Sequence, residues 1–183
     1  MLQGDDARRL IYLNTGFENA SPLWWEENAP GRVDVYQNYD HERETPNRAA
    51  GHWHFQAQAE PGTELTFTLH NLDNVWNGKP GFPLSERTLC NVSEDGRTWR
   101  HVETEVIGGN KLRFTVTLRG DSLFIAHLEP YRISDLETLC DEIREHPRVQ
   151  ITEIGRTVRG RSLEIIRIGS DDAPHRVFLR ARA

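Results

Sequence analysis

Two histidines lie at a spacing that could bind a metal ion. His52 and His54 are separated by one residue in the stretch GHWHFQAQ, so in a strand they would point to the same face. Imidazoles placed in this way can chelate zinc. Their neighbours Trp53 and Phe55 are apolar and would occupy the opposite face. We therefore expect a solvent-facing or edge pair of histidines opposite a buried face, rather than a metal site.

A second cluster combines carboxylates with a histidine in the stretch YDHERE. Asp40, His41, Glu42 and Glu44 include the residue types of a metal site and of a general acid and base. The cluster has mixed charge and directly precedes the turn-forming residues 45–47. Such a composition is more typical of a solvated loop, and we expect a loop here.

The stretch SEDGRTW resembles the Asp-box turn of sialidase-like propellers. The residues that carry this likeness are Ser93, Asp95, Gly96, Thr98 and Trp99. One residue is missing between the aspartate and the tryptophan, and the pattern occurs once instead of repeating with each blade. We therefore expect a tight hairpin anchored by a buried tryptophan.

Charge and composition exclude several classes of function. The chain has 183 residues, 37% of them hydrophobic and 27% charged, which is enough for a folded core. Its formal net charge is −6, so we expect neither nucleic acid nor an anionic membrane as a partner. Asp5, Asp6 and Arg8 interrupt any signal peptide, which predicts a cytoplasmic protein. Cys90 and Cys140 are then expected to be buried thiols.

Strand patterns fill the sequence up to residue 128, the predicted end of the first domain (1–128). The predicted strands are 10–14, 32–36, 51–58, 63–69, 88–92, 98–106, 111–118 and 122–128. The turn-forming pair Pro61-Gly62 predicts that residues 51–69 form a hairpin. A long loop is expected over 70–87. So many strands without a helix favour an antiparallel β-sandwich.

The pattern changes to α/β in the second predicted domain (129–183). Apolar residues at helical spacing predict a helix over 133–147, with Ser134 as the N-cap, Glu137 completing a capping box and Pro147 ending the helix. The next predicted strands are 149–155, 162–169 and 175–181. We expect this second domain to be truncated and, since its apolar strands lack covering helices, unstable on its own. The predicted fold class is therefore mainly β, with the truncated beginning of an α/β domain.

The junction between these parts, DSLFIAHLEPYRISDLETL, resembles a known enzyme family. It is similar to the passage from the N-terminal sandwich to the catalytic domain in cytosolic carboxypeptidase-like members of the M14 zinc carboxypeptidases. The matching residues are Phe124, Ala126, His127, Pro130, Tyr131, Asp135 and Leu136. The stretch IGRTVRGRSLEIIRIG is similar to an early hairpin of that family, through Gly155, Thr157, Gly160, Arg161 and Leu163. The stretch GHWHFQAQ is similar to one of its sandwich strands.

The resemblance implies an enzyme whose reactive groups lie outside this sequence. In M14 enzymes a His-x-x-Glu motif with two zinc ligands comes directly after the strand that corresponds to 177–183, and a third ligand, an arginine and a general-base glutamate come later. All of them would lie beyond Ala183, so no catalytic, cofactor-binding or metal-binding residue is assigned to this chain. The intact enzyme would bind Zn²⁺ and remove C-terminal residues from peptide or protein tails. The chain alone would be inactive, its partner being the remainder of its own catalytic domain.

Three tryptophans leave a different class of function open. Trp24, Trp25 and Trp76 are expected in loops, where exposed aromatic rings could stack on sugars or contact a partner. This pattern favours the alternative of a non-enzymatic sandwich that binds a glycan or protein surface. Trp76 could instead pack at the seam with the catalytic domain. The arginines between 156 and 182 are expected to be exposed neighbours of Glu153 and Glu164 rather than an anion site.

Overall fold

The computed structural model describes residues 9–179, apart from 39–45, 50, 82–83 and 85–87. The chain divides into two compact units, Met1–Pro130 and Tyr131–Ala183. Each unit is described by itself below. No helix among the described residues has the length and apolar character needed to cross a bilayer.

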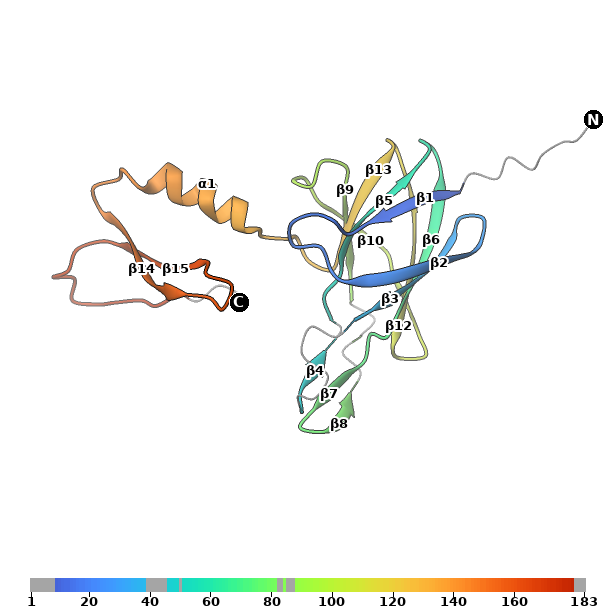
Figure 1. Ribbon diagram of the computed structural model, residues 1–183, viewed down its shortest axis with the longest axis horizontal. Coiled ribbons are helices and arrows are strands. Elements are labelled where there is room, and N and C mark those ends of the chain that lie inside the picture. Colours follow the sequence, from blue (N-terminus) through green and yellow to red (C-terminus); the bar gives the residue numbers. More distant parts are fainter. Residues whose placement is uncertain (1–8, 39–45, 50, 82–83, 85–87, 180–183) are drawn as a thin grey trace, which may run out of the picture. The chain divides into compact units, whose positions relative to one another are not determined.

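Two five-stranded sheets make up most of the first unit (Figure 1). The first sheet has the order β1 (Leu10–Asn14), β5 (His54–Ala59), β13 (Ser122–Ala126), β9 (Cys90–Ser93) and β10 (Arg100–Val102). The second sheet has the order β11 (Glu105–Ile107), β12 (Lys111–Thr117), β6 (Glu64–His70), β3 (Arg32–Gln37) and β2 (Leu23–Ala29). Every pair in these two sheets is antiparallel except β3 with β6, which is parallel. The predicted β-sandwich is therefore confirmed.

The core lies between the two sheets because apolar residues alternate along the strands that face each other. In β6, Leu65, Phe67 and Leu69 are fully buried, while the residues between them are partly exposed. The ring of Phe67 lies 5.7 Å from that of Phe55 in the first sheet and 5.5 Å from that of Phe114 in β12. These aromatic contacts join both sheets into one core.

The predicted hairpin over 51–69 is wrong. β5 pairs with β1 and β13, and β6 pairs with β12 and β3, so the turn at Pro61-Gly62 carries the chain from one sheet to the other. The Thr63 N–H donates to the Glu60 carbonyl at 3.1 Å, and Gly62 has a φ of 81°. Proline followed by a glycine with positive φ is typical of a type II turn, which splays two strands instead of pairing them.

A small third sheet occupies part of the predicted 70–87 loop. Its order is β4 (Arg48–Ala49), β7 (Asn74–Trp76) and β8 (Lys79–Gly81), and it projects beyond one end of the two large sheets (Figure 1). Asn77 and Gly78 both have positive φ, at 49° and 74°. This pair is the typical two-residue connection of a tight hairpin, so the sequence WNGK forms a turn between strands.

The second unit begins with one helix, α1 (Ile133–Ile143). Its N-cap is Arg132, and the predicted N-cap at Ser134 is wrong. The Asp135 carboxylate accepts hydrogen bonds from the Arg132 backbone N–H at 2.8 Å and from its Nε at 3.0 Å. An acidic side chain at this position satisfies a free backbone donor and interacts favourably with the helix dipole, so the N-cap lies two residues before the predicted one.

A hairpin of β14 (Val149–Arg156) and β15 (Ser162–Ile168) completes the regular structure of this unit, at the positions that the sequence predicts. The predicted strand over 175–181 is wrong for residues 175–179, which are not in a strand; residues 180 and 181 lie outside the described part. Val177, Phe178 and Leu179 are each more than 80% exposed. An isolated strand is not stable, and no described strand pairs with this segment.

Candidate functional site on the outer face of the second sheet

The predicted His52 and His54 pair does not form an exposed site. His54 is only 3% exposed, and its Nδ1 lies 3.1 Å from the Asn19 carbonyl oxygen. Its ring also contacts Phe17 edge to face, at 4.9 Å between ring centres. The expectation of a solvent-facing pair is therefore wrong for His54, because a loop and aromatic side chains cover this face of the first sheet. His52 is partly exposed.

The stretch YDHERE, where the sequence predicts a solvated loop, is not tested by the structure. Asp40, His41, Glu42 and Glu44 lie outside the described residues. Within the described residues, no group of three or more histidine, cysteine, aspartate or glutamate side chains could hold a metal ion. Cys90 and Cys140 are free and buried, as predicted. Burial raises the pKa of the Cys90 thiol to about 12, so it remains protonated.

The SEDGRTW stretch forms the predicted hairpin between β9 and β10. Asp95 organises its turn: one oxygen accepts from the backbone N–H groups of Arg97 and Thr98 and from the Ser93 hydroxyl, at 2.7–2.9 Å. These hydrogen bonds hold the pKa of Asp95 far below its usual range. Trp99 is partly exposed rather than fully buried. A carboxylate that is saturated in this way has a structural role.

The tryptophans lie in strands, so the prediction that they occupy loops is wrong. Trp24 and Trp25 belong to β2, and Trp76 belongs to β7. Trp25 packs against the core and contacts Tyr12 edge to face at 6.3 Å. Trp24 is 53% exposed and Trp76 is 68% exposed. Of the neighbouring pair, only Trp24 is free to contact a ligand.

Trp24 lies on the outer face of the second sheet, where side chains of neighbouring strands form rows. Residues that are paired across strands point to the same side, so registered partners line up. The aromatic row consists of Trp24, Tyr36 and His70. The charged row consists of Glu26, Asp34, Thr68, Arg113 and Glu105. The threonine row consists of Arg32, Thr66 and Thr115.

The aromatic row is a continuous stack across three strands. The rings of Trp24 and Tyr36 are 3.8 Å apart and nearly parallel, at 4°. The rings of Tyr36 and His70 are 4.5 Å apart at 20°. Because each ring supports the next, the exposed Trp24 ring has a fixed orientation.

Two carboxylates lie next to this stack and tie it to the charged row. The Tyr36 hydroxyl donates to Glu26 Oε1 at 2.8 Å, and His70 Nε2 lies 3.0 Å from Asp34 Oδ1. The Asn28 side-chain amide donates to the other oxygen of Asp34. The hydrogen bond to Glu26, together with the negative charge of both carboxylates, raises the pKa of Tyr36 to about 12.

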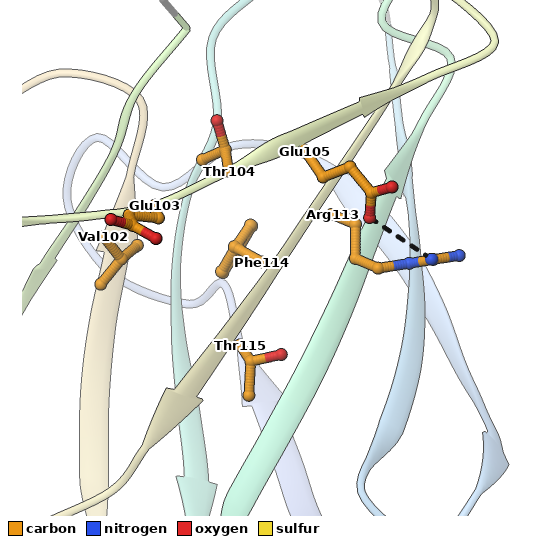
Figure 2. A pocket seen from close by; sticks show the side chains of 7 residues that line it. All are labelled: Val102, Glu103, Thr104, Glu105, Arg113, Phe114 and Thr115. Atoms are coloured by element: carbon orange, nitrogen blue, oxygen red, sulfur yellow. Dashed lines mark ion pairs between the residues drawn. The ribbon is translucent and has the colours of Figure 1, made fainter. Parts of the chain in front are cut away.

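Arg113, in the charged row, borders two open pockets. One, of about 370 Å³, lies over Thr66 and Thr68 between Arg32 and Arg113. The other, of about 470 Å³, is shown in Figure 2, with the buried Phe114 among its lining residues. The dashed line there marks the ion pair of Glu105 and Arg113, at 3.6 Å. Both signs of charge line this end of the face, so it favours neither cations nor anions.

The chemistry of this face is stacking, ion pairing and hydrogen bonding, which is the chemistry of recognition. Its residues Asp34, Tyr36 and His70 were not found as candidates by sequence reasoning. The alternation of Val33 and Val35 does place Asp34 and Tyr36 on one outer face. The pairing of β3 with β2 and β6, which assembles the row, has no signal in the local sequence.

The fold is that of metallocarboxypeptidase structures. The chain superposes with a TM-score of 0.73 on a protein assigned as a carboxypeptidase A from Shewanella denitrificans, at 22% identity over 88% of this chain and 41% of that one. A metallo-carboxypeptidase from Burkholderia cenocepacia matches with a TM-score of 0.72 and 18% identity, over 90% of this chain and 41% of that one. A metallo-carboxypeptidase from Pseudomonas aeruginosa, solved with (2-guanidinoethylmercapto)succinic acid, matches with a TM-score of 0.71 and 20% identity, over 89% of this chain and 42% of that one.

The family match covers the residues of the sandwich. Residues 14–128 match the family model of the cytosolic carboxypeptidase N-terminal domain, and the chain belongs to this family. The M14-type resemblance inferred from the sequence is thereby confirmed. The chain spans about 41% of the length of the solved structures that it matches. No curated protein sequence matches it significantly.

Proposed function

We propose that this chain supplies the N-terminal domain of a zinc-dependent metallocarboxypeptidase that removes C-terminal residues from peptides or proteins. The observation that carries this proposal is the family match over residues 14–128. The structural likeness supports it further. It covers 88% of the chain, more than residues 1–128 alone can provide, and so includes part of 129–183. The chain therefore shares with these structures the sandwich and at least part of the second unit.

The zinc ligands and catalytic groups are assigned to polypeptide outside the described residues. An open zinc site for peptide hydrolysis needs three protein ligands and a free position for water. The described residues contain no cluster of three such side chains and therefore do not fit the metal. In this proposal the chain takes no part in bond cleavage, and its role is structural support of the catalytic domain.

Peptide or protein tails are the proposed substrates, and the cytoplasm is the proposed location. The family description names cytosolic carboxypeptidases, which supports this location. Two free cysteines, both buried, are compatible with a reducing compartment. The proposed partner of this chain is the remainder of its own catalytic domain.

The test compares the 183-residue chain with the full-length product of its gene. The full-length protein is expected to hold one zinc ion per chain and to release amino acids from the C-terminus of peptides. The isolated chain is expected to do neither. Zinc can be measured by elemental analysis and released amino acids by mass spectrometry. A full-length product without zinc and without peptidase activity would overturn the proposal.

The alternative, a glycan-binding sandwich, receives less support from the structure. It rests on Trp24, Trp25 and Trp76 as exposed rings in loops, but all three lie in strands and Trp25 packs against the core, while Trp76 is exposed. One face of Trp24 is covered by Tyr36. A glycan array with the wild-type chain and with Trp24→Ala tests this alternative. A glycan-binding sandwich is expected to bind particular glycans and to lose that binding in Trp24→Ala, whereas a supporting domain of a peptidase is not expected to bind glycans.

A further inference from the structure

We propose that the outer face of β2 and β3 binds an extended basic peptide, with an arginine or lysine side chain placed between the Trp24 ring and the Glu26 carboxylate. We call this site the Trp24 corner, defined by Trp24, Glu26, Asp34 and Tyr36. It is separate from any peptidase chemistry and does not depend on the proposed function.

The Trp24 ring has a fixed orientation and an uncovered face that could bind a cation. Its inner face stacks on Tyr36 at 3.8 Å, and β2 is the last strand of its sheet, so no described strand covers the outer side of the ring. Tryptophan has the strongest attraction for ammonium and guanidinium groups among the aromatic side chains. Because the stack already fixes the ring, binding a cation costs little side-chain entropy.

The charges next to this ring are negative. Glu26 and Asp34 are direct partners in the antiparallel register of β2 and β3. Like charges placed opposite each other on one face of a sheet destabilise it, and a bound cation would relieve this repulsion. The Tyr36 hydroxyl donates to Glu26 Oε1 at 2.8 Å, so this carboxylate is held next to the Trp24–Tyr36 stack.

His70 Nε2 lies 3.0 Å from Asp34 Oδ1, and the other chargeable groups of this face lie farther from Trp24. Arg32 belongs to the threonine row, on the side of the charged row away from Trp24. Arg113 lies two strands beyond β3 and is paired with Glu105 at 3.6 Å. Neither Arg32 nor Arg113 is therefore next to Trp24, and the charged side chains of the Trp24 corner, Glu26 and Asp34, attract a cation.

An extended peptide is the occupant that the strand order favours. β2 pairs with β3 on one side and has no paired strand on its other side among the described residues. The outward backbone groups of an edge strand can pair with an added strand. A peptide paired along β2 would place alternate side chains on the outer face, level with Trp24 and Glu26. The chain's net charge of −6 favours a basic peptide over an acidic one.

The test is a titration of the 183-residue chain with a capped pentapeptide of alternating threonine and arginine. Binding is measured by calorimetry and by shifts of the backbone amide signals of β2. The control ligand is the same peptide with citrulline in place of arginine, which keeps the shape and removes the charge. The arginine peptide is expected to bind at least about tenfold more tightly. Equal binding of the two peptides would overturn the proposal.

Variants of the protein locate the site. Trp24→Leu and Glu26→Gln are each expected to weaken binding about threefold, and the double variant about tenfold. Matched controls are Trp76→Leu, which removes another exposed tryptophan, and Glu105→Gln, which removes another carboxylate of the same face. Both should bind like the wild type. Controls that weaken binding as much as the site variants would overturn the assignment to the Trp24 corner.

Two further measurements separate the alternatives. Urea midpoints of the variants show whether lost binding reflects lost folding. Glu26→Gln removes the repulsion with Asp34 and is expected to keep or slightly raise the wild-type midpoint. Free argininamide offers the same cation without a strand. It should bind more weakly than the peptide, with shifts at Trp24 but not along the β2 backbone. If argininamide binds as tightly as the peptide, the extended-peptide proposal is wrong.

Discussion

The two units of this chain differ in how many of their apolar side chains are buried. Of the 22 buried hydrophobic residues in the described structure, 21 belong to the first unit and one, Cys140, belongs to the second. The second unit exposes apolar side chains on β14, β15 and the segment after them, including Ile154, Ile168 and Phe178. Both units have strands with regular pairing, so hydrogen-bonded strands alone do not distinguish them.

The difference in burial follows from the number of secondary-structure layers in each unit. The first unit has two sheets, and the apolar face of each covers that of the other. The second unit has a two-stranded sheet and one helix of 11 residues, with Cys140 as its single buried helical residue. A lone two-stranded hairpin is marginal in water. We infer that stability in this chain resides in the sandwich.

The largest expected effect is in amide hydrogen exchange. Amides of β5, β6 and β12 should exchange only through global unfolding, which for a domain corresponds to about 5–15 kcal/mol. Amides of β14 and β15 should exchange through local opening that costs far less free energy, because few apolar contacts hold the hairpin. Exchange of the whole 183-residue chain, followed by NMR, measures both. Equal protection in the two units would contradict this comparison.

Loss of a large core side chain should have the next largest effect. Phe67 is fully buried and contacts both Phe55 and Phe114, so Phe67→Ala is expected to lower the free energy of unfolding by about 3–5 kcal/mol. The matched control is Phe178→Ala, at a residue that is 81% exposed, which should change it by less than about 0.5 kcal/mol. Urea unfolding followed by fluorescence measures both. Similar losses for the two variants would show that the second unit has a core of its own.

Substitution of a glycine that lies close to a neighbouring backbone should have a smaller effect on stability. Gly31 has a φ of 72°, and a Cβ there would lie 2.8 Å from the Glu64 carbonyl oxygen. Gly31→Ala should therefore destabilise the sandwich by about 2 kcal/mol. Gly160 in the second unit has a φ of 78° with open space around it. Gly160→Ala strains its own turn but should leave the urea midpoint of the sandwich unchanged. A shift of that midpoint would indicate that the two units unfold together.

The smallest effect concerns pH. The pKa of Asp95 is lowered in the folded state, so its contribution to stability is complete above the unfolded value of about 4 and is lost as the pH falls further. The difference in urea midpoint between wild type and Asp95→Asn should therefore shrink below about pH 4. Glu153 in the second unit also has a lowered pKa, through Ser162 and Arg156. Glu153→Gln should leave the sandwich midpoint unchanged at every pH, and any change would argue against separate units.

Strand positions were predictable from sequence because alternation is local. Leu65, Phe67 and Leu69 mark β6 without any knowledge of its partners. Sheet membership was not predictable in the same way. The pair Pro61-Gly62 predicts a turn but not a hairpin, because proline followed by glycine favours a type II turn, which is a poor hairpin connection. The parallel pairing of β3 with β6 links residues 34 positions apart, such as Arg32 and Thr66, and has no local signal.

The candidate surface was less predictable than the fold. Trp24 was found by its residue type, but its place in a strand was missed because the stretch LWWEENA does not alternate cleanly between apolar and polar residues. The Trp24 corner needs the register of β2 with β3, which brings Glu26 opposite Asp34. A register is set by the whole sheet and its core, so residue types alone cannot supply it. The M14-type family, in contrast, was predictable because its junction residues are contiguous in the sequence.

The position of β13 has a consequence for biosynthesis. This strand is the last of the sandwich in chain order, yet it lies between β5 and β9 in the middle of its sheet. A ribosome must therefore translate past Ala126 before the pairs β1–β5 and β9–β10 can be joined. Until then β5 and β9 each lack the partner strand that lies between them in the finished sheet, and unpaired strand edges favour aggregation. A premature stop codon before Ser122 would leave the sandwich in this unfinished condition.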